Sequence, residues 1–161
     1  MIKIGSRPPP SFDEPLAALL HCHEKMGERL DTLERAAAAL AADPTAAFAA
    51  ISEVLQHFAK AGARHTEDEE GSVWPRVRDE RLEPVLEELS VEHRAVEAIQ
   101  LALRDTVTRA VPDEAAAHAR AFAAAYREHM RKEEEHVFPA VASLDPAEIR
   151  AIGIEMRLRR G

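Results

Sequence analysis

Two segments of this sequence repeat one arrangement of side chains that can bind metals. In each, a histidine is followed by glutamates at i+4 and i+5, an aromatic residue at i+9 and a proline at i+10. The two sets are His65, Glu69, Glu70, Trp74 and Pro75, and His129, Glu133, Glu134, Phe138 and Pro139. On a helix, positions i and i+4 share a face, so each histidine and its first glutamate aim at one point. Imidazole with carboxylate suits Fe, Zn and Mn, and two such pairs predict a two-metal site.

Length, composition and charge narrow the class of protein that holds these residues. The 161 residues correspond to one domain, and with few glycines and abundant Ala, Leu, Glu and Arg they favour helix. A net charge of −8 makes nucleic acid and anionic membranes poor partners. No apolar run approaches the roughly 18 residues of a membrane span. The N-terminus lacks a signal-peptide pattern and Cys22 has no second cysteine to pair with, so we expect a cytoplasmic protein.

Apolar spacing and prolines predict five helices. The first extends from about residue 13 to 41, capped by Ser11 or Asp13, and the second from 44 to about 70; Pro84 and Pro112 open the third and fourth, and a shorter one follows Asp145. Short connections make consecutive helices antiparallel neighbours. The sequence therefore predicts an all-α fold: an N-terminal arm (1–12), an up-down-up-down four-helix bundle (13–142), and a C-terminal helix packed on it (143–161).

Each of the four bundle helices carries one histidine at a similar height. At about 1.5 Å per residue, His23, His65, His93 and His129 all lie roughly 10–15 Å from the same end of an antiparallel bundle. Each interrupts an apolar stripe, so each is expected to face inward. Burying these imidazoles with Glu69 and Glu133 would be costly without a cation. A pair of metal ions resolves this conflict.

Taken one at a time, these residues have commoner roles than metal binding. A single histidine on an apolar face is usually a hydrogen-bonded core residue, and a single His-x-x-x-Glu is often a solvated pair. The coincidence of all six favours metal. Glu133 and His136 also match the Glu-x-x-His of ferritin-like proteins, but Ser72 stands where a second copy needs histidine. A structural zinc site normally has four ligands, which fits six candidates poorly.

These residues make the chain similar to the hemerythrin-like HHE cation-binding family. The resemblance covers about residues 12–142 and rests on Leu19 to Glu24, His65 to Pro75, Glu92 with His93, and His129 to Pro139. It implies a four-helix bundle around an oxo- or hydroxo-bridged pair of iron ions. By the same resemblance, His23 and His65 would hold one iron, His93 and His129 the other, and Glu69 and Glu133 would bridge both.

The chain departs from oxygen-carrying hemerythrins on its third helix. Those proteins have a further histidine one turn after the first, where this chain has Glu97. Glu97 is open to three interpretations: a seventh ligand, a second-shell acceptor, or a solvated residue. His136 and Tyr126 are further second-shell candidates. Glu70 and Glu134 are expected in the second shell or on the surface.

The resemblance implies a small ligand at the iron pair. One hypothesis is a protein that binds or senses O2 or NO, and the alternative is a di-iron enzyme of oxidative or nitrosative stress that turns over peroxide or NO or repairs iron centres. The six-residue set is more similar to bacterial relatives linked to nitrosative stress than to respiratory carriers. A third hypothesis is a bundle without metal. The ligands are the same in the first two cases, so the sequence leaves open whether the protein is an enzyme, and it does not indicate an oligomeric state.

Overall fold

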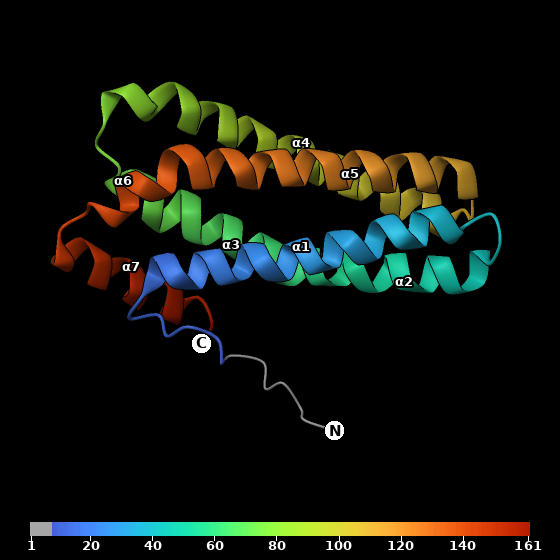
Figure 1. Ribbon diagram of the computed structural model, residues 1–161, viewed down its shortest axis with the longest axis horizontal. Coiled ribbons are helices and arrows are strands. Elements are labelled where there is room, and N and C mark those ends of the chain that lie inside the picture. Colours follow the sequence, from blue (N-terminus) through green and yellow to red (C-terminus); the bar gives the residue numbers. More distant parts are fainter. Residues whose placement is uncertain (1–7) are drawn as a thin grey trace.

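The protein is a bundle of four long antiparallel helices with a short helix at one end (Figure 1). The computed structural model describes residues 8–161; the expected arm at 1–12 therefore lies mostly outside the described residues. The first bundle helix is α1 (Pro15–Ala39). The second is a continuous series of α2 (Pro44–His57), η1 (Phe58–Gly62), α3 (Ala63–Asp68), η2 (Glu69–Val73) and η3 (Trp74–Arg76). After the short turn η4 (Glu80–Leu82), the third bundle helix is α4 (Glu83–Thr108). The fourth is a series of α5 (Pro112–Lys132), η5 (Glu133–Val137) and α6 (Phe138–Ala142). The C-terminal helix is α7 (Pro146–Leu158).

Prolines define where the helices start, as the sequence predicts. A proline occupies the first turn of α1, α2, α4, α5 and α7, where no intrahelical partner for its missing N–H is needed. Asp43 caps α2 by accepting a hydrogen bond from the Ala46 N–H at 3.1 Å. The predicted cap of α1 was wrong, because Ser11 accepts instead from the Asp13 N–H in the preceding turn and Glu14 makes no side-chain cap.

A layer of buried polar residues divides the core in two. One apolar cluster contains Met26, Phe58, Val96 and Tyr126, and the other contains Leu19, Val73, Trp74, Leu89, Val137 and Phe138. Along each helix the candidate histidine lies between members of the two clusters. His23, for example, lies between Leu19 and Met26. The polar layer is therefore covered by apolar side chains above and below.

The second and fourth bundle helices are not uniform α-helices, which the sequence did not reveal. The second contains π-helical turns at η1 and η2, and the fourth contains one at η5. Two of these turns begin at matching positions of the repeat, Glu69 and Glu133. A π turn holds an additional residue, so every side chain after it is rotated relative to an uninterrupted α-helix.

The helix α7 packs against α1, α3 and η2, at the left end of the bundle in Figure 1. The two arginines that follow its C-terminal end enclose Asp68, which is fully buried: Arg159 Nη1 lies 3.0 Å and Arg160 Nη2 2.7 Å from the carboxylate. Arg159 also donates to the Ser72 hydroxyl at 2.8 Å. These contacts fix α7 to the turn that carries Glu69.

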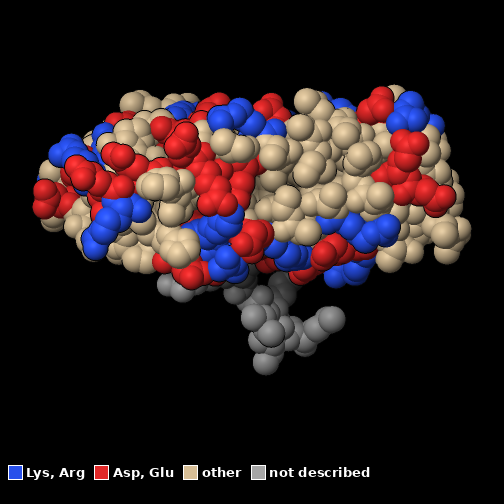
Figure 2. Space-filling view, turned by 90° about the horizontal axis from the view of Figure 1, so that it is seen from above, with Lys and Arg blue, Asp and Glu red and all other residues tan. Residues whose placement is uncertain are grey.

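The outer face of α4 and α5 carries many charges, and acidic and basic side chains mix over its left half in Figure 2. Lys132 on α5 contacts Glu88 on α4 at 2.6 Å, and it also contacts Glu92. None of the helices within residues 8–161 combines the length and apolar composition needed to cross a bilayer.

Candidate metal centre

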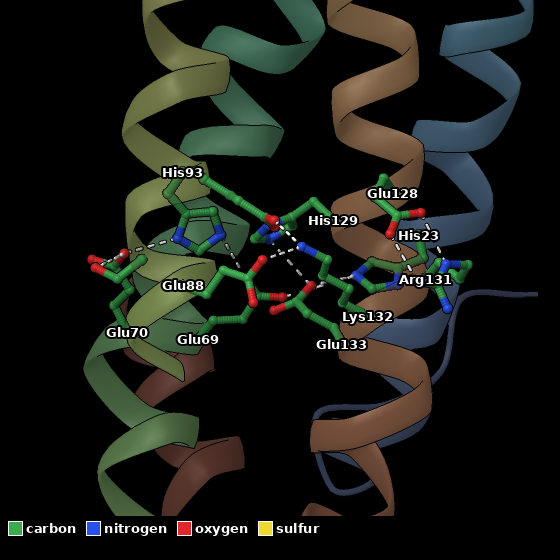
Figure 3. A network of polar contacts seen from close by, with 12 residues as sticks. His23, Glu69, Glu70, Glu88, His93, Glu128, His129, Arg131, Lys132 and Glu133 are labelled. Atoms are coloured by element: carbon green, nitrogen blue, oxygen red, sulfur yellow. Dashed lines mark hydrogen bonds and ion pairs between the residues drawn. The ribbon is translucent and has the colours of Figure 1, made fainter. Parts of the chain in front are cut away.

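The structure brings the six candidate ligands together in one buried cluster. Figure 3 shows how His23, Glu69, His93, His129 and Glu133 converge between the helices. The two Nε2 atoms of His23 and His65 lie 3.0 Å apart. The Nε2 of His93 lies 3.2 Å from Glu69 Oε2, and that of His129 lies 3.5 Å from Glu133 Oε2. Glu69 and Glu133 are both fully buried. All four imidazoles thus present one ring nitrogen to two enclosed carboxylates.

The side chains of this cluster leave polar atoms without partners. Within residues 8–161, neither oxygen of Glu69 or Glu133 has a hydrogen-bond partner in good geometry, nor has Nε2 of His129. Such buried orphan atoms are rare, because each loses its hydration without compensation. Acceptor oxygens and imidazole nitrogens that converge are the ligands of a cation. The residues therefore fit the metal that their types predict.

Two overlapping groups of candidate ligands share the carboxylates. His23 and His65 form one group with Glu69 and Glu133, and His93 and His129 form the other with the same two glutamates. Within each group, one ligand atom of every residue lies within 4.8 Å of the others. Two groups with both carboxylates in common have the arrangement of a binuclear metal site.

The charges of the cluster interact strongly. Burial and the neighbouring Glu69 carboxylate raise the pKa of Glu133 to about 7. Burial also acts to raise the pKa of Glu69, but His65, His23 and His93 outweigh it and hold that pKa well below its usual range. Burial opposes the charge on His23, but the Glu133 and Glu69 carboxylates, 3.3 Å and 3.8 Å from its Nε2, raise its pKa to about 9. Burial and the charge of His93 lower the pKa of His129 to about 4. The metal-free cluster therefore shares protons that a bound metal must displace.

Three of the four histidines are held by a carboxylate on their outer side. Nδ1 lies 2.7 Å from Glu134 in His23, 2.8 Å from Glu70 in His93, and 3.0 Å from Glu92 in His129. An Nδ1–H that donates to a carboxylate leaves the Nε2 lone pair free to point inward, and it increases the basicity of that nitrogen. The sequence left open whether Glu70 and Glu134 support the ligands or lie only on the surface. In the structure each contacts a candidate ligand directly, His93 and His23 respectively.

Each repeated segment supports a histidine that lies outside the repeats, on the other pair of helices. Glu70 of the first segment and Glu134 of the second bind the histidine of the opposite pair of helices. The aromatic residues do the same: Trp74 stacks on His93 with ring centroids 5.1 Å apart and an interplanar angle of 4°, and Phe138 stacks on His23 at 5.1 Å and 26°. Every part of the repeat before its proline therefore has a place in or around the cluster.

His136 and Glu97, two candidates for contact with the metal ligands, lie outside the cluster. His136 is exposed and lies 3.8 Å from Glu135, because the π turn of η5 rotates it away from the inner face expected for an α-helix. Glu97 is exposed and lines an open cavity. Leu89 and Val96 are buried on one side of His93 around α4, and Glu97 lies on the other side, which agrees with the third interpretation, a solvated residue.

Tyr126 lies where the sequence places it, beside the cluster. It is 6% exposed, and its ring lies 6.2 Å from that of His129 and 4.8 Å from that of Phe58. Burial and the nearby Glu69 and Glu133 carboxylates raise the pKa of its hydroxyl, so this group stays protonated.

Sequence reasoning missed Glu92, which holds His129 and is itself held by Lys132. Glu92 is adjacent to His93 and therefore points about 100° away from it, toward the neighbouring α5. Only the packing of α4 on α5 reveals this contact. No spacing within one helix indicates it.

An antiparallel four-helix bundle with this buried His/Glu cluster defines a class of helical metal-binding proteins. The family model for the hemerythrin HHE cation binding domain matches residues 14–141, and the chain belongs to this family. This confirms the predicted family and the hemerythrin fold. The search of curated proteins gives no match to the sequence.

Proposed function

We propose that the cluster holds two iron ions and binds a diatomic ligand, O2 or NO, at the carboxylate-bridged pair. The observation that supports this most is the pair of overlapping groups in which Glu69 and Glu133 belong to both. A mixed imidazole and carboxylate set suits iron, and four histidines with two carboxylates exceed the needs of a four-ligand zinc site. The choice of O2 or NO rests on the family alone.

In this proposal His23 and His65 would hold one ion, His93 and His129 would hold the other, and Glu69 and Glu133 would serve both. Iron supplies reversible electron transfer to the small ligand when bound. The chain itself fixes the imidazole orientation through the outer carboxylates and limits water through the two apolar clusters.

Turnover of peroxide or NO, with or without a role in iron-centre repair, is the second candidate function. Its supporting observation is a cavity of about 520 Å³ that reaches His93, since turnover needs continuous exchange of reactant and product. Product formation over many cycles would favour it. Binding that is reversed by removing the ligand gas would favour the first function.

Metal analysis of the iron-loaded protein tests the proposal. We expect two iron ions per chain. Glu69→Gln should lose metal because its amide replaces a bridging carboxylate, whereas the control Glu67→Gln should keep both ions because Glu67 is exposed on α3. Glu133→Gln and the exposed Glu135→Gln form a second matched pair. One ion per chain, or two ions retained in Glu69→Gln at unchanged affinity, would contradict the bridged pair.

A further inference from the structure

A groove between the second bundle helix and α4 reaches one edge of the metal cluster. Its volume is about 520 Å³, and it is lined by Phe58, Gly62, His93, Val96 and Tyr126, with polar residues at its mouth. A second cavity of about 320 Å³, also between α2 and α4, touches none of the six candidate ligands. The larger groove is therefore the one with a connection to the cluster.

His93 is the ligand candidate at this edge. It is 7% exposed, compared with 2% for His65 and for His129. Figure 3 shows it with Glu70 at the side of the cluster, and the Glu70 side chain is 41% exposed. The face toward α6 is covered, since Phe138 stacks on His23 and Val137 is fully buried.

Gly62 is buried and lines the groove beside Phe58 and Tyr126, and without a side chain it leaves the space between them unfilled. A Cβ at Gly62 would lie 3.2 Å from the Phe58 ring and 3.5 Å from the Tyr126 hydroxyl. A methyl group there would occupy the space beside that hydroxyl. Tyr126 lines the groove, and its ring also lies 6.2 Å from that of His129, so it stands between the groove and the cluster. Within residues 8–161 its hydroxyl makes no hydrogen bond, and its surroundings act on it only through burial and nearby charges.

We propose that this groove is the route by which a small ligand reaches the metal pair, and that the Tyr126 hydroxyl at its inner end donates a hydrogen bond to the ligand in the site. The inference rests on the proposed function. The opening at Gly62 sets the rate of entry, and Tyr126 sets the rate of escape. A neutral hydroxyl within an apolar wall favours a ligand whose oxygen atom can accept a hydrogen bond, as in O2 or NO, over N2 or another inert gas.

Substitutions at two depths of the groove test the route. Gly62→Ala narrows the inner opening, and its control is Gly27→Ala in α1, where a Cβ would meet nothing within 4 Å. Ala63→Trp fills the outer groove from an exposed position and leaves the core intact, with the equally exposed Ala38→Trp in α1 as its control. If Gly62→Ala fails to fold, Ala63→Trp still tests the route.

The measurement is the association and dissociation of NO on the reduced, iron-loaded protein by stopped-flow absorption. We expect Gly62→Ala and Ala63→Trp to slow association several-fold while both controls match the unsubstituted protein. Tyr126→Phe should leave association unchanged and speed dissociation about fivefold to tenfold, as expected for one lost hydrogen bond. Iron content should be unchanged in all variants.

A second readout uses the metal-free protein. Dissolved O2 accelerates the nuclear relaxation of methyl groups that it approaches, and the Val96 methyl groups line the groove. We expect this effect at Val96 to fall in Ala63→Trp and to persist in Ala38→Trp.

The outcomes separate the two proposals. If the unsubstituted protein with two iron ions binds no NO and no O2, the proposed function is wrong. If it binds NO but Gly62→Ala and Ala63→Trp associate as fast as their controls, the route is wrong. If dissociation from Tyr126→Phe equals that from the unsubstituted protein, the hydrogen bond is wrong.

Discussion

The protonated cluster should make the metal-free protein less stable as the pH rises above 7. The pKa of His23 is about 9 in the folded protein and about 6.5 in an unfolded chain. A base with a raised pKa holds its proton more tightly when folded, so its stabilisation is complete below pH 6.5 and is lost as the pH rises through 9. At 1.36 kcal/mol per pKa unit, His23 contributes about 3 kcal/mol. His65 and His93, whose pKa values are also raised, act in the same direction.

Urea unfolding of chelator-treated protein between pH 6 and pH 10, at constant ionic strength, measures this effect. The free energy of unfolding should fall across the range, by up to about 1.4 kcal/mol per pH unit for each proton lost. His23→Gln removes one titrating group and should flatten the curve. Iron should reverse the dependence, because its ligands must be deprotonated and its affinity rises with pH.

Stability of the metal-free protein that stays constant or increases between pH 7 and 9 would refute this reasoning. A curve for His23→Gln with the same slope as the unsubstituted protein would show that the proton responsible lies elsewhere. In either case the cluster would not share protons as its geometry indicates.

Three further substitutions have defined expectations. Glu134→Gln should weaken metal binding about 10- to 100-fold by removing the carboxylate that holds His23, measured by chelator competition, and affinity within twofold of the unsubstituted protein would contradict that role. Arg160→Ala should destabilise the protein by about 2 kcal/mol in urea, because it leaves the buried Asp68 with one cation, and a loss under 0.5 kcal/mol would argue against the contact. Gly153→Ala should destabilise the protein by about 1–3 kcal/mol, seen as a lower midpoint of thermal unfolding, because the added methyl group overlaps the backbone carbonyl of Phe12, in the segment before α1. An unchanged midpoint would show that this segment can move aside without cost.

Much of the fold and cluster follows from local signals in the sequence. Prolines mark the starts of the helices, and the i, i+4 spacing brings His65 near Glu69 whatever the rest of the chain does. The levels of His23 and His93 follow from helix length alone.

The parts that failed depend on non-local packing. Phase arguments assume 3.6 residues per turn, and the π turn at η5 breaks that assumption before His136. Which of the three interpretations of Glu97 holds was left open, because it depends on how α4 packs against its neighbours. Glu92 holds His129 across two helices, and no pattern within one helix encodes that distance.

The exchange of supporting residues between the two repeats has a consequence for how the protein assembles. Glu70 and Trp74 from the first helix pair complete the surroundings of His93, and Glu134 and Phe138 from the second complete those of His23. Neither half of the chain therefore contains all the residues that surround its own histidines. Suppose the chain is divided between η3 and α4 and the two fragments are produced separately. They should stay monomeric at low concentration and associate when iron is added, so that metal binding drives the formation of a heterodimer.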